Sequence, residues 1–356
     1  MPILRHVSPQ LPTAHHRKAA QLMAARGFKG LGEAYALGYI SGAGADRLLG
    51  VLARVLVHLS HTPGYVSAIR IMRPRSRSWH RGTSPAGTVR NLVWHYDLEP
   101  EFFGVFLDDS MTYSCADFDS PDVALGAAQR LKIERLVSLL EVAPHSRVLD
   151  VGCGWGSVAE AAAGAGGDVV AVSASPSQID YCRTHRSSNI AFLVGDFREF
   201  NLGTFDSVVS CEMIEGVGAQ NLEEFMSWIS GHLVLGGTFV LQAITTADSR
   251  VKTATVDTGF VSQYVFPGGQ ILSERMIASA ARRAGMSLGH ADKMGPSYAA
   301  TIREWRDNLR GSRTRLSRLG VSPELFGVWD FYFSMCITGF DAGDMDCVRF
   351  VFRRSR

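Results

Sequence analysis

The stretch Val148-Leu-Asp-Val-Gly-Cys-Gly-Trp-Gly156 decides the fold of this chain. Apolar residues lead into Asp150, and glycines follow at positions 152, 154 and 156, a pattern typical of a buried parallel strand that breaks into a tight turn before a helix. Because glycine has no Cβ atom, this backbone can approach a ligand closely, and the amide groups of the following helix favour an anionic ligand group. The stretch therefore predicts a binding site that includes Asp150, Gly152 and Gly154.

A glycine-rich turn by itself has two other interpretations, a nicotinamide-dinucleotide loop and a plain strand-to-helix turn. Here the acidic residue precedes the three glycines, as Asp-x-Gly-x-Gly-x-Gly. This order resembles the first motif of class I S-adenosylmethionine methyltransferases more than it resembles a Gly-x-Gly-x-x-Gly nicotinamide site. The cofactor that this resemblance implies is S-adenosylmethionine.

Strand-like and helix-like segments alternate from about residue 130 onward, which indicates an α/β fold with a doubly wound, Rossmann-like sheet. A helix is expected over 221–233, and a last strand over 346–352 should close the sheet. The other expected strands span 147–151, 168–173, 190–194, 205–211 and 238–244.

Residues 1–85 are expected to form a small helical domain that ends in a basic linker, and residues 86–356 a methyltransferase domain. Helical spacing recurs over 18–26 and 46–59, with a glycine-punctuated loop expected at 30–35. The linker is either a solvated segment or a site that docks on anionic phospholipid, where each basic residue contributes about 1 kcal/mol. Its arginines are Arg70, Arg73, Arg75, Arg77 and Arg81.

Composition and charge are those of an ordinary globular protein. The chain has 356 residues, of which 46% are hydrophobic and 20% are charged, and its net charge of +2 argues against a nucleic-acid partner. The six cysteines include no Cys-x-x-Cys pair, so we expect no metal site and a reducing, cytoplasmic location. No run approaches the roughly 18 apolar residues of a membrane span, so we expect any membrane contact to be peripheral, on the inner face.

Polar residues follow the second and third expected strands, where ligands bind in an open α/β sheet. Ser173, Ser175 or Gln178 is expected to bind the ribose of the cofactor, although the same run also forms a good helix N-cap. Asp196 is expected to accept a hydrogen bond from the adenine amino group, with a surface-turn aspartate as the alternative.

Several segments together resemble one family, the cyclopropane-fatty-acid-phospholipid synthases and their mycolic-acid-modifying relatives. They occur in the family's order from about residue 28 onward, which makes the resemblance more specific than the glycine turn alone. It implies a seven-stranded methyltransferase sheet with a small N-terminal helical domain. The segments are 30–35, Asn91-Leu-Val-Trp-His-Tyr-Asp-Leu98 with Phe102 and Phe103, Met111-Thr-Tyr-Ser-Cys115, Glu212-Met-Ile-Glu-Gly-Val-Gly218, Tyr264-Val-Phe-Pro-Gly-Gly269, Ser297-Tyr298 with Trp305, and Phe331-Tyr332.

The resemblance implies that the methyl group of S-adenosylmethionine is transferred to the cis double bond of an unsaturated phospholipid acyl chain. The product would be a cyclopropane or a methyl- or methylene-branched chain, formed through a carbocation that aromatic side chains stabilise. The resemblance also implies that Tyr113 and Ser114 touch the cofactor, and the family is often homodimeric.

The family holds a bicarbonate ion as the base, and its catalytic cage corresponds here to Cys115, Glu215, Tyr298 and the backbone of Ile244. Where the family has histidine, two residues before Ile244, this chain has Gln242, which can donate a hydrogen bond but cannot become cationic. The family's Glu-His-Val-Gly run is likewise Glu-Gly-Val-Gly here. Anion binding would then be weaker, or a different base would take the proton.

Each cage residue also has a purely structural interpretation. Cys115 can be a small buried apolar side chain, Glu215 a capping partner, and Tyr298 a core aromatic residue with a satisfied hydroxyl group. Two other functions stay open at this point: methyl transfer to a specialised small molecule, and a non-catalytic subunit that binds lipid or cofactor.

Overall fold

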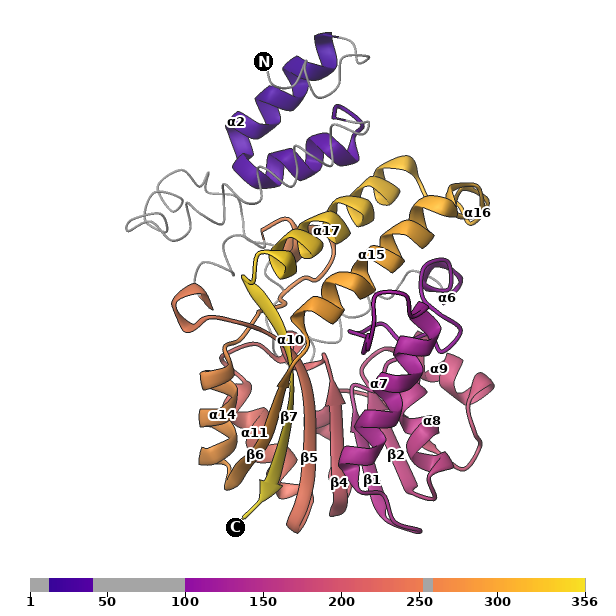
Figure 1. Ribbon diagram of the computed structural model, residues 1–356, viewed down its shortest axis with the longest axis vertical. Helices are drawn as coiled ribbons and strands as arrows, with labels where there is room; N and C mark the ends of the chain where they lie inside the picture. The colour runs from indigo at the N-terminus through magenta and orange to yellow at the C-terminus, as the bar shows by residue number, and fades with distance from the viewer. Residues whose placement is uncertain (1–12, 41–99, 252–258, 356) are drawn as a thin grey trace.

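The computed structural model describes residues 13–40, 100–251 and 259–355. Its centre is a seven-stranded sheet in the order β3-β2-β1-β4-β5-β7-β6, which confirms the predicted fold class (Figure 1). Strands β1 to β5 run parallel, and β7 runs antiparallel to both β5 and β6. The strands are β1 (Arg147–Val151), β2 (Asp168–Ser173), β3 (Ala191–Val194), β4 (Phe205–Cys211), β5 (Leu233–Thr246), β6 (Met286–Lys293) and β7 (Met345–Arg354).

The first five expected strands are confirmed, although β5 is longer than expected. The prediction that the last strand closes the sheet is wrong, because β7 inserts between β5 and β6 and leaves β6 at the edge. Sequence patterns do not predict β6. Met286 is the only buried residue of this strand, so the alternation of apolar and polar residues that marks a half-buried strand is missing.

Helices cover both faces of the sheet, because successive strand residues point to opposite sides. On one face, Val148, Val169 and Val209 pack against α7, α8 and α9. On the other face, Leu149 and Val208 pack against α10, α11 and α14. These helices are α7 (Leu125–Leu140), α8 (Ser157–Gly164), α9 (Pro176–His185), α10 (Ile214–Val217), α11 (Leu222–Gly231) and α14 (Glu274–Arg283), so that α11 confirms the helix expected over 221–233.

A further helical layer lies beyond the carboxyl ends of the parallel strands. Helices α15 (Gly295–Gly311) and α17 (Pro323–Asp341) run side by side above that edge of the sheet (Figure 1). Their core is mainly aromatic and includes the buried Trp305 and Trp329. The shorter elements are α6 (Pro100–Phe103), α13 (Val261–Tyr264), α16 (Arg313–Arg318) and the 3₁₀ helices η1 (Phe197–Glu199) and η2 (Asp248–Arg250).

Helix α2 (Thr13–Ala36) lies against α17 on the outside of this layer (Figure 1). A buried cluster joins the two helices. The hydroxyl group of Tyr35 donates to the carboxylate of Asp330 on α17, which also accepts hydrogen bonds from Nε of Arg306 and Nε of Arg310, each at 2.7 Å. Because an unpaired buried carboxylate is costly, these three donors hold α2 and the helical layer together.

The helix expected over 18–26 is confirmed as part of α2, but the loop expected at 30–35 is wrong, because those residues are helical. The break in α2 is at Gly27, which has a left-handed φ of 57°. Glycine at 30 and 32 serves close packing instead of chain reversal. A Cβ atom on Gly30 would lie 2.0 Å from the carbonyl oxygen of Leu22, and one on Gly32 would lie 2.5 Å from the ring of Phe260.

Four predictions concern residues outside the described ranges. They are the helix over 46–59, the basic linker with its five arginines, the motif at 91–98 and the domain boundary near residue 85. Within the described ranges, no helix has the length and apolarity needed to span a bilayer.

Candidate active site

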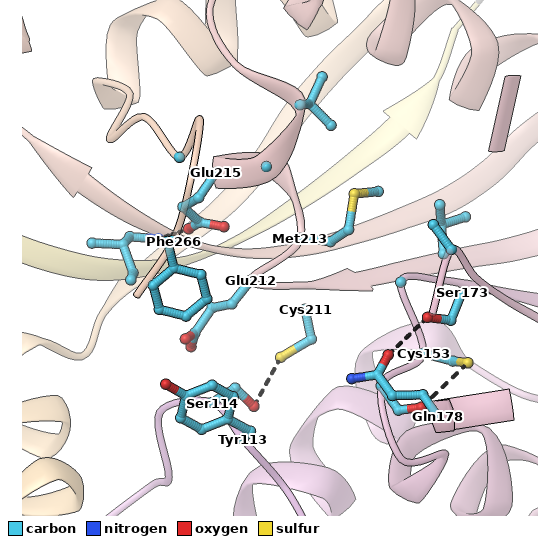
Figure 2. A pocket seen from close by; sticks show the side chains of 18 of the residues that line it. Tyr113, Ser114, Cys153, Ser173, Gln178, Cys211, Glu212, Met213, Glu215 and Phe266 are labelled. Atoms are coloured by element: carbon cyan, nitrogen blue, oxygen red, sulfur yellow. Dashed lines mark hydrogen bonds between the residues drawn. The ribbon is translucent and has the colours of Figure 1, made fainter. Parts of the chain in front are cut away.

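A cavity of about 270 Å³ lies beyond the carboxyl ends of β1, β2 and β4, where the strand order reverses. One part of its wall is the glycine turn with the polar residues that follow β2 and β3, and another part is aromatic and comes from the helical layer. Figure 2 shows Ser173 and Gln178 on one side of the cavity and Glu212, Glu215 and Phe266 on the other. The cavity therefore joins a polar part to an aromatic part that also carries two carboxyl groups.

The turn after β1 brings bare backbone to the cavity wall. Gly152 and Gly154 have left-handed backbones, with φ of 81° and 54°, and both line the cavity. A Cβ atom on Gly152 would lie 2.4 Å from Cγ of Met213, whereas one on Gly154 would meet no described atom within 4 Å. Packing therefore restricts position 152 to glycine, and position 154 leaves open space at the cavity wall.

Asp150 is buried at the end of β1 and lines the same cavity. Its Oδ2 atom accepts no hydrogen bond from the residues that the structure describes. Burial raises the pKa of Asp150 to about 7, against the opposing positive charge of Lys132. An unpaired buried acceptor costs free energy unless a ligand or water reaches it, so this oxygen fits a polar group of a bound molecule.

Lys132 is a fully buried residue of α7 that no sequence pattern singled out. Its Nζ atom donates a hydrogen bond of 2.8 Å to Oγ of Ser114 and lies 4.0 Å from Sγ of Cys211. Ser114 and the preceding Tyr113 both line the cavity, where the sequence predicted them. The lysine therefore fixes the segment that carries these two side chains.

Three polar residues were expected to bind a ribose, and two of them reach the cavity wall. Oγ of Ser173 donates to Oε1 of Gln178 at 2.7 Å, and both residues line the cavity (Figure 2). Ser175 is instead the N-cap of α9, where its Oγ accepts a hydrogen bond of 3.4 Å from the amide of Gln178. The capping interpretation therefore describes Ser175, and Ser173 and Gln178 stay the candidate ribose ligands.

Asp196 is buried and lines the cavity, so the surface-turn interpretation is wrong. Both of its carboxylate oxygens are paired with Arg198, whose Nε and Nη2 atoms each donate at 2.7 Å. Arg198 also lines the cavity, and no sequence pattern indicated it. A ligand at this edge would meet an ion pair and not a free carboxylate.

The predicted cage residues lie close together but not all at the surface of the cavity. Glu215, Ile244 and Tyr298 line it, whereas Cys115 and Gln242 are fully buried behind the wall. The Sγ atom of Cys115 donates to the carbonyl oxygen of Ala116 at 3.3 Å, whereas its backbone amide and carbonyl groups contact Glu212 and Gln242. The backbone of Cys115 therefore forms part of the site.

Glu212, directly after β4, is a further cavity-lining residue that the sequence analysis did not assign to the site. The backbone amide of Cys115 and Nε2 of Gln242 donate to its Oε1 atom at 2.9 Å and 2.8 Å. The hydroxyl group of Tyr298 donates to its Oε2 atom. A charged side chain at the carboxyl end of a central strand, beside the point where the strand order reverses, is the signal that indicates such a residue.

Glu215, on α10, is the second carboxyl group in the wall. The backbone amide of Ile244 donates to its Oε1 atom at 2.5 Å, and its Oε2 atom has no hydrogen-bond partner among the described residues. Burial, together with the nearby charge of Glu212, raises the pKa of Glu215 to about 8. Glu215 is therefore mostly protonated at neutral pH.

Aromatic side chains line the same cavity as these two carboxyl groups. The ring of Tyr113 stacks on that of Phe266 with centroids 6.3 Å apart, and the ring of Tyr298 lies 4.6 Å from that of Phe340. Burial and the charge of Glu212 hold the pKa of Tyr298 well above its ordinary value, so its hydroxyl group stays a neutral donor. Desolvated aromatic faces stabilise a cation by about 2 kcal/mol or more, so this part of the cavity suits a positively charged intermediate.

The arrangement can bind a ligand with polar and apolar parts. Among the described residues, no group of three or more His, Cys, Asp or Glu side chains is placed to hold a metal ion. The described residues supply a glycine turn, hydroxyl and amide groups after β2, a paired carboxylate and an aromatic wall.

Comparisons with known proteins agree with this geometry. A family model described as mycolic acid cyclopropane synthetase matches residues 83–350. Tuberculostearic acid methyltransferase UfaA1 of Mycobacterium tuberculosis is 32% identical over 340 residues, which is 92% of this chain and 79% of that protein.

Two solved structures with related sequences have the same fold. The cyclopropane synthase MmaA2 from Mycobacterium tuberculosis has a TM-score of 0.68 and 27% identity, and the match covers 74% of this chain and 98% of that one. The mycolic acid cyclopropane synthase CmaA1, solved with SAH and CTAB, has a TM-score of 0.69 and 26% identity with the same coverage.

Proposed function

This chain belongs to the mycolic acid cyclopropane synthetase family, whose members are S-adenosylmethionine-dependent methyltransferases, and from that premise we propose that it methylates a double bond in the acyl chain of an unsaturated lipid. The proposal is supported by one observation above the others. A single cavity joins the glycine turn to an aromatic wall that holds a carboxylate, so that cofactor and acyl chain would meet in the same space.

The residues at the polar part of the cavity fit S-adenosylmethionine. Gly152 and Gly154 would let the backbone approach the cofactor, and Ser173 and Gln178 would bind the ribose hydroxyl groups. The unpaired Oδ2 atom of Asp150 would accept a hydrogen bond from the bound molecule. When bound, S-adenosylmethionine would supply a methyl group on a positively charged sulfur, and its transfer to a double bond leaves the acyl chain positively charged.

The aromatic wall would protect that charge. Tyr113, Phe266 and Tyr298 line the cavity close to Glu212, and their rings exclude water that would otherwise trap a carbocation as an alcohol. Their π faces would stabilise the positive charge until a proton leaves. We infer a phospholipid acyl chain as the substrate and a cyclopropane or a methyl- or methylene-branched chain as the product.

The residues do not fit a bound bicarbonate ion. Four groups at the predicted cage positions can donate hydrogen bonds: the backbone amides of Cys115 and Ile244, the side chain of Gln242 and the hydroxyl group of Tyr298. All four already donate to the carboxyl groups of the protein itself. A second anion would also lie against the charge of Glu212, with no cationic side chain at position 242 to offset the repulsion.

Four further parts of the proposal concern the protein as a whole. We infer a cytoplasmic protein, a division into a helical domain at 1–85 and a methyltransferase domain at 86–356, a homodimer, and peripheral contact with anionic membranes through Arg70, Arg73, Arg75, Arg77 and Arg81. Sedimentation with anionic vesicles tests the membrane contact, which should weaken as salt rises above about 0.15 M, where the screening length is near 8 Å.

Methyl transfer can be tested directly with purified protein. Incubation with methyl-labelled S-adenosylmethionine and vesicles of an unsaturated phospholipid should place label in the acyl chains, and vesicles of a saturated phospholipid are the control. Mass spectrometry of the released fatty acids then distinguishes a ring from a branch. If none of several unsaturated lipids becomes labelled, the proposal is contradicted. Label confined to a water-soluble extract would favour a specialised small-molecule substrate.

A further inference from the structure

Resting on the proposed methyl transfer, we propose that Glu212 is the base that removes the proton from the positively charged acyl chain, so that this enzyme carries its base as a side chain and needs no bound anion. The proposal names a further catalytic residue, because Glu212 lines the cavity in which the reacting carbons would lie. Figure 2 shows its carboxyl group on the same side of the cavity as Glu215 and Phe266.

Hydrogen-bond donors from several parts of the fold converge on this carboxylate. The backbone amide of Cys115, Nε2 of Gln242 and the hydroxyl group of Tyr298 all donate to Glu212, and the thiol of Cys347 adds a longer contact of 3.6 Å. Donors from four separate segments fix the position of the carboxylate. The same donors would hold a free anion if the side chain of Glu212 were absent.

The presence of glutamine at position 242 is consistent with a carboxylate base at Glu212. A neutral side-chain amide suits a site that already contains a carboxylate, because its NH₂ group has two donors. Nε2 of Gln242 uses them for Oε1 of Glu212 at 2.8 Å and for the carbonyl oxygen of Cys115 at 3.2 Å. Gln242 therefore positions the base, and a cationic side chain to attract an anion is not needed.

The backbone of Glu212 is left-handed, with a φ of 51°. This conformation is unfavourable for a residue with a side chain, and such strain is concentrated at functional sites. The amide of Glu212 donates to the carbonyl oxygen of Gln242 at 2.7 Å, which helps to hold the strained residue at the end of β4. The backbone thus aims the carboxyl group into the cavity.

The neighbouring Glu215 has a different environment and protonation state. Its Oε1 atom accepts a hydrogen bond of 2.5 Å from the amide of Ile244, and its Oε2 atom has no hydrogen-bond donor among the described residues. Burial beside Glu212 raises the pKa of Glu215 to about 8, so it is mostly protonated at neutral pH and cannot accept a further proton there. Of the two carboxyl groups in this wall, Glu212 is therefore the one available as a base.

In the proposed reaction, methyl transfer to the double bond is followed by loss of one proton to Glu212. The π electrons of the double bond form the new carbon–carbon bond to the methyl group, and the electron pair of the sulfur–carbon bond stays on sulfur. An oxygen atom of Glu212 then accepts one proton from the transferred methyl group, and the electron pair of that C–H bond closes a three-membered ring on the cationic carbon. If a hydride first shifts to that carbon, the same proton loss gives a methylene branch. Glu212 later releases its proton to water.

The test compares two variants of Glu212 with wild type. Glu212→Gln preserves the size of the side chain but cannot act as the base, so product formation should fall at least 100-fold while the Kd for S-adenosylhomocysteine stays within threefold. Glu212→Gly suits the left-handed backbone, frees the donors and opens a space, so added formate or bicarbonate should restore activity to this variant and not to Glu212→Gln. Glu134→Gln, at an exposed position of α7, is the matched control and should behave as wild type.

The outcomes separate this proposal from the proposed function. A wild-type enzyme that transfers no label to lipid contradicts the function itself. If wild type is active, three results would each overturn the assignment of the base: Glu212→Gln within tenfold of wild type, loss of wild-type activity in carbon dioxide-free buffer with recovery on adding bicarbonate, or a Glu212→Gly protein that binds S-adenosylhomocysteine normally and is rescued by no small anion.

Discussion

Replacing Gly154 with alanine tests whether the glycine turn holds the cofactor. Gly154 lines the cavity with a φ of 54°, and a Cβ atom at this position would meet no described atom within 4 Å. The added methyl group would therefore leave the packing of the folded protein unchanged and occupy open space at the cavity wall. Any large loss of affinity would come from competition with the bound molecule for that space.

Two free-energy terms set the size of the effect. A left-handed backbone costs a residue other than glycine about 1–2 kcal/mol, so the free energy of unfolding should fall by about that amount. Overfilling a packed site costs about 1–3 kcal/mol, which corresponds to a roughly 5- to 150-fold weaker Kd. Gly152→Ala should be the more destabilising change, because its Cβ atom would lie 2.4 Å from Cγ of Met213.

The assay is isothermal titration with S-adenosylhomocysteine, accompanied by urea unfolding of the same samples. Gly164→Ala is the matched control, since Gly164 is exposed at the end of α8 and an alanine there should leave affinity unchanged and stability equal or slightly higher. A folded Gly154→Ala protein with a Kd within twofold of wild type would refute the placement of the cofactor against this turn.

Three further predictions concern stability and turnover. Because the folded state holds Glu215 at a pKa of about 8, against an ordinary value of 4.5, the folded state binds the extra proton between these values, and stability should fall as pH rises from 4.5 to 8 by up to about 1.4 kcal/mol per pH unit. Thermal melts of Glu215→Gln should lack this decline, and parallel curves for the two proteins would contradict it. Asp330→Asn should lower the free energy of unfolding in urea by about 3 kcal/mol, because it removes the buried negative charge to which Arg306 and Arg310 donate, and should expose α2 to protease; an unchanged urea midpoint would count against the cluster. Tyr298→Phe removes one donor from Glu212, so turnover should fall about tenfold with unchanged affinity for S-adenosylhomocysteine, and wild-type turnover would show that the hydroxyl group has no part in the reaction.

Local patterns predicted the part of the fold that depends on local rules. Strand β1 and the turn at Gly152 and Gly154 are encoded in one short run, and β2 matches its expected limits because a buried parallel strand is a nearly continuous apolar run. Strand β6 has almost no buried face, so nothing local marks it. Gly30 suggested a loop, because the sequence does not distinguish a glycine needed for its small size from one needed for its backbone freedom. Here the small size permits close contact between two turns of helix.

The candidate site was predicted in outline but not in its central residue. The resemblance identified Tyr298 and Gln242, and the structure places both beside Glu212. Their partner was missed because its donors lie 97, 30 and 86 residues away along the chain, at Cys115, Gln242 and Tyr298. Only the folded sheet brings these segments together, and no local pattern shows which of two glutamates receives them.

Helix α17 has two roles that couple distant parts of the molecule. Its residues Tyr332 and Met335 line the cavity, while Asp330 on the same helix is held by Tyr35 of α2. The N-terminal segment thus stabilises, from outside the cavity, the wall that an acyl chain would touch. If the proposed substrate occupies this cavity, we expect that exchanging α2 between relatives changes the preferred length of the acyl chain, although no described residue of α2 lines the cavity itself.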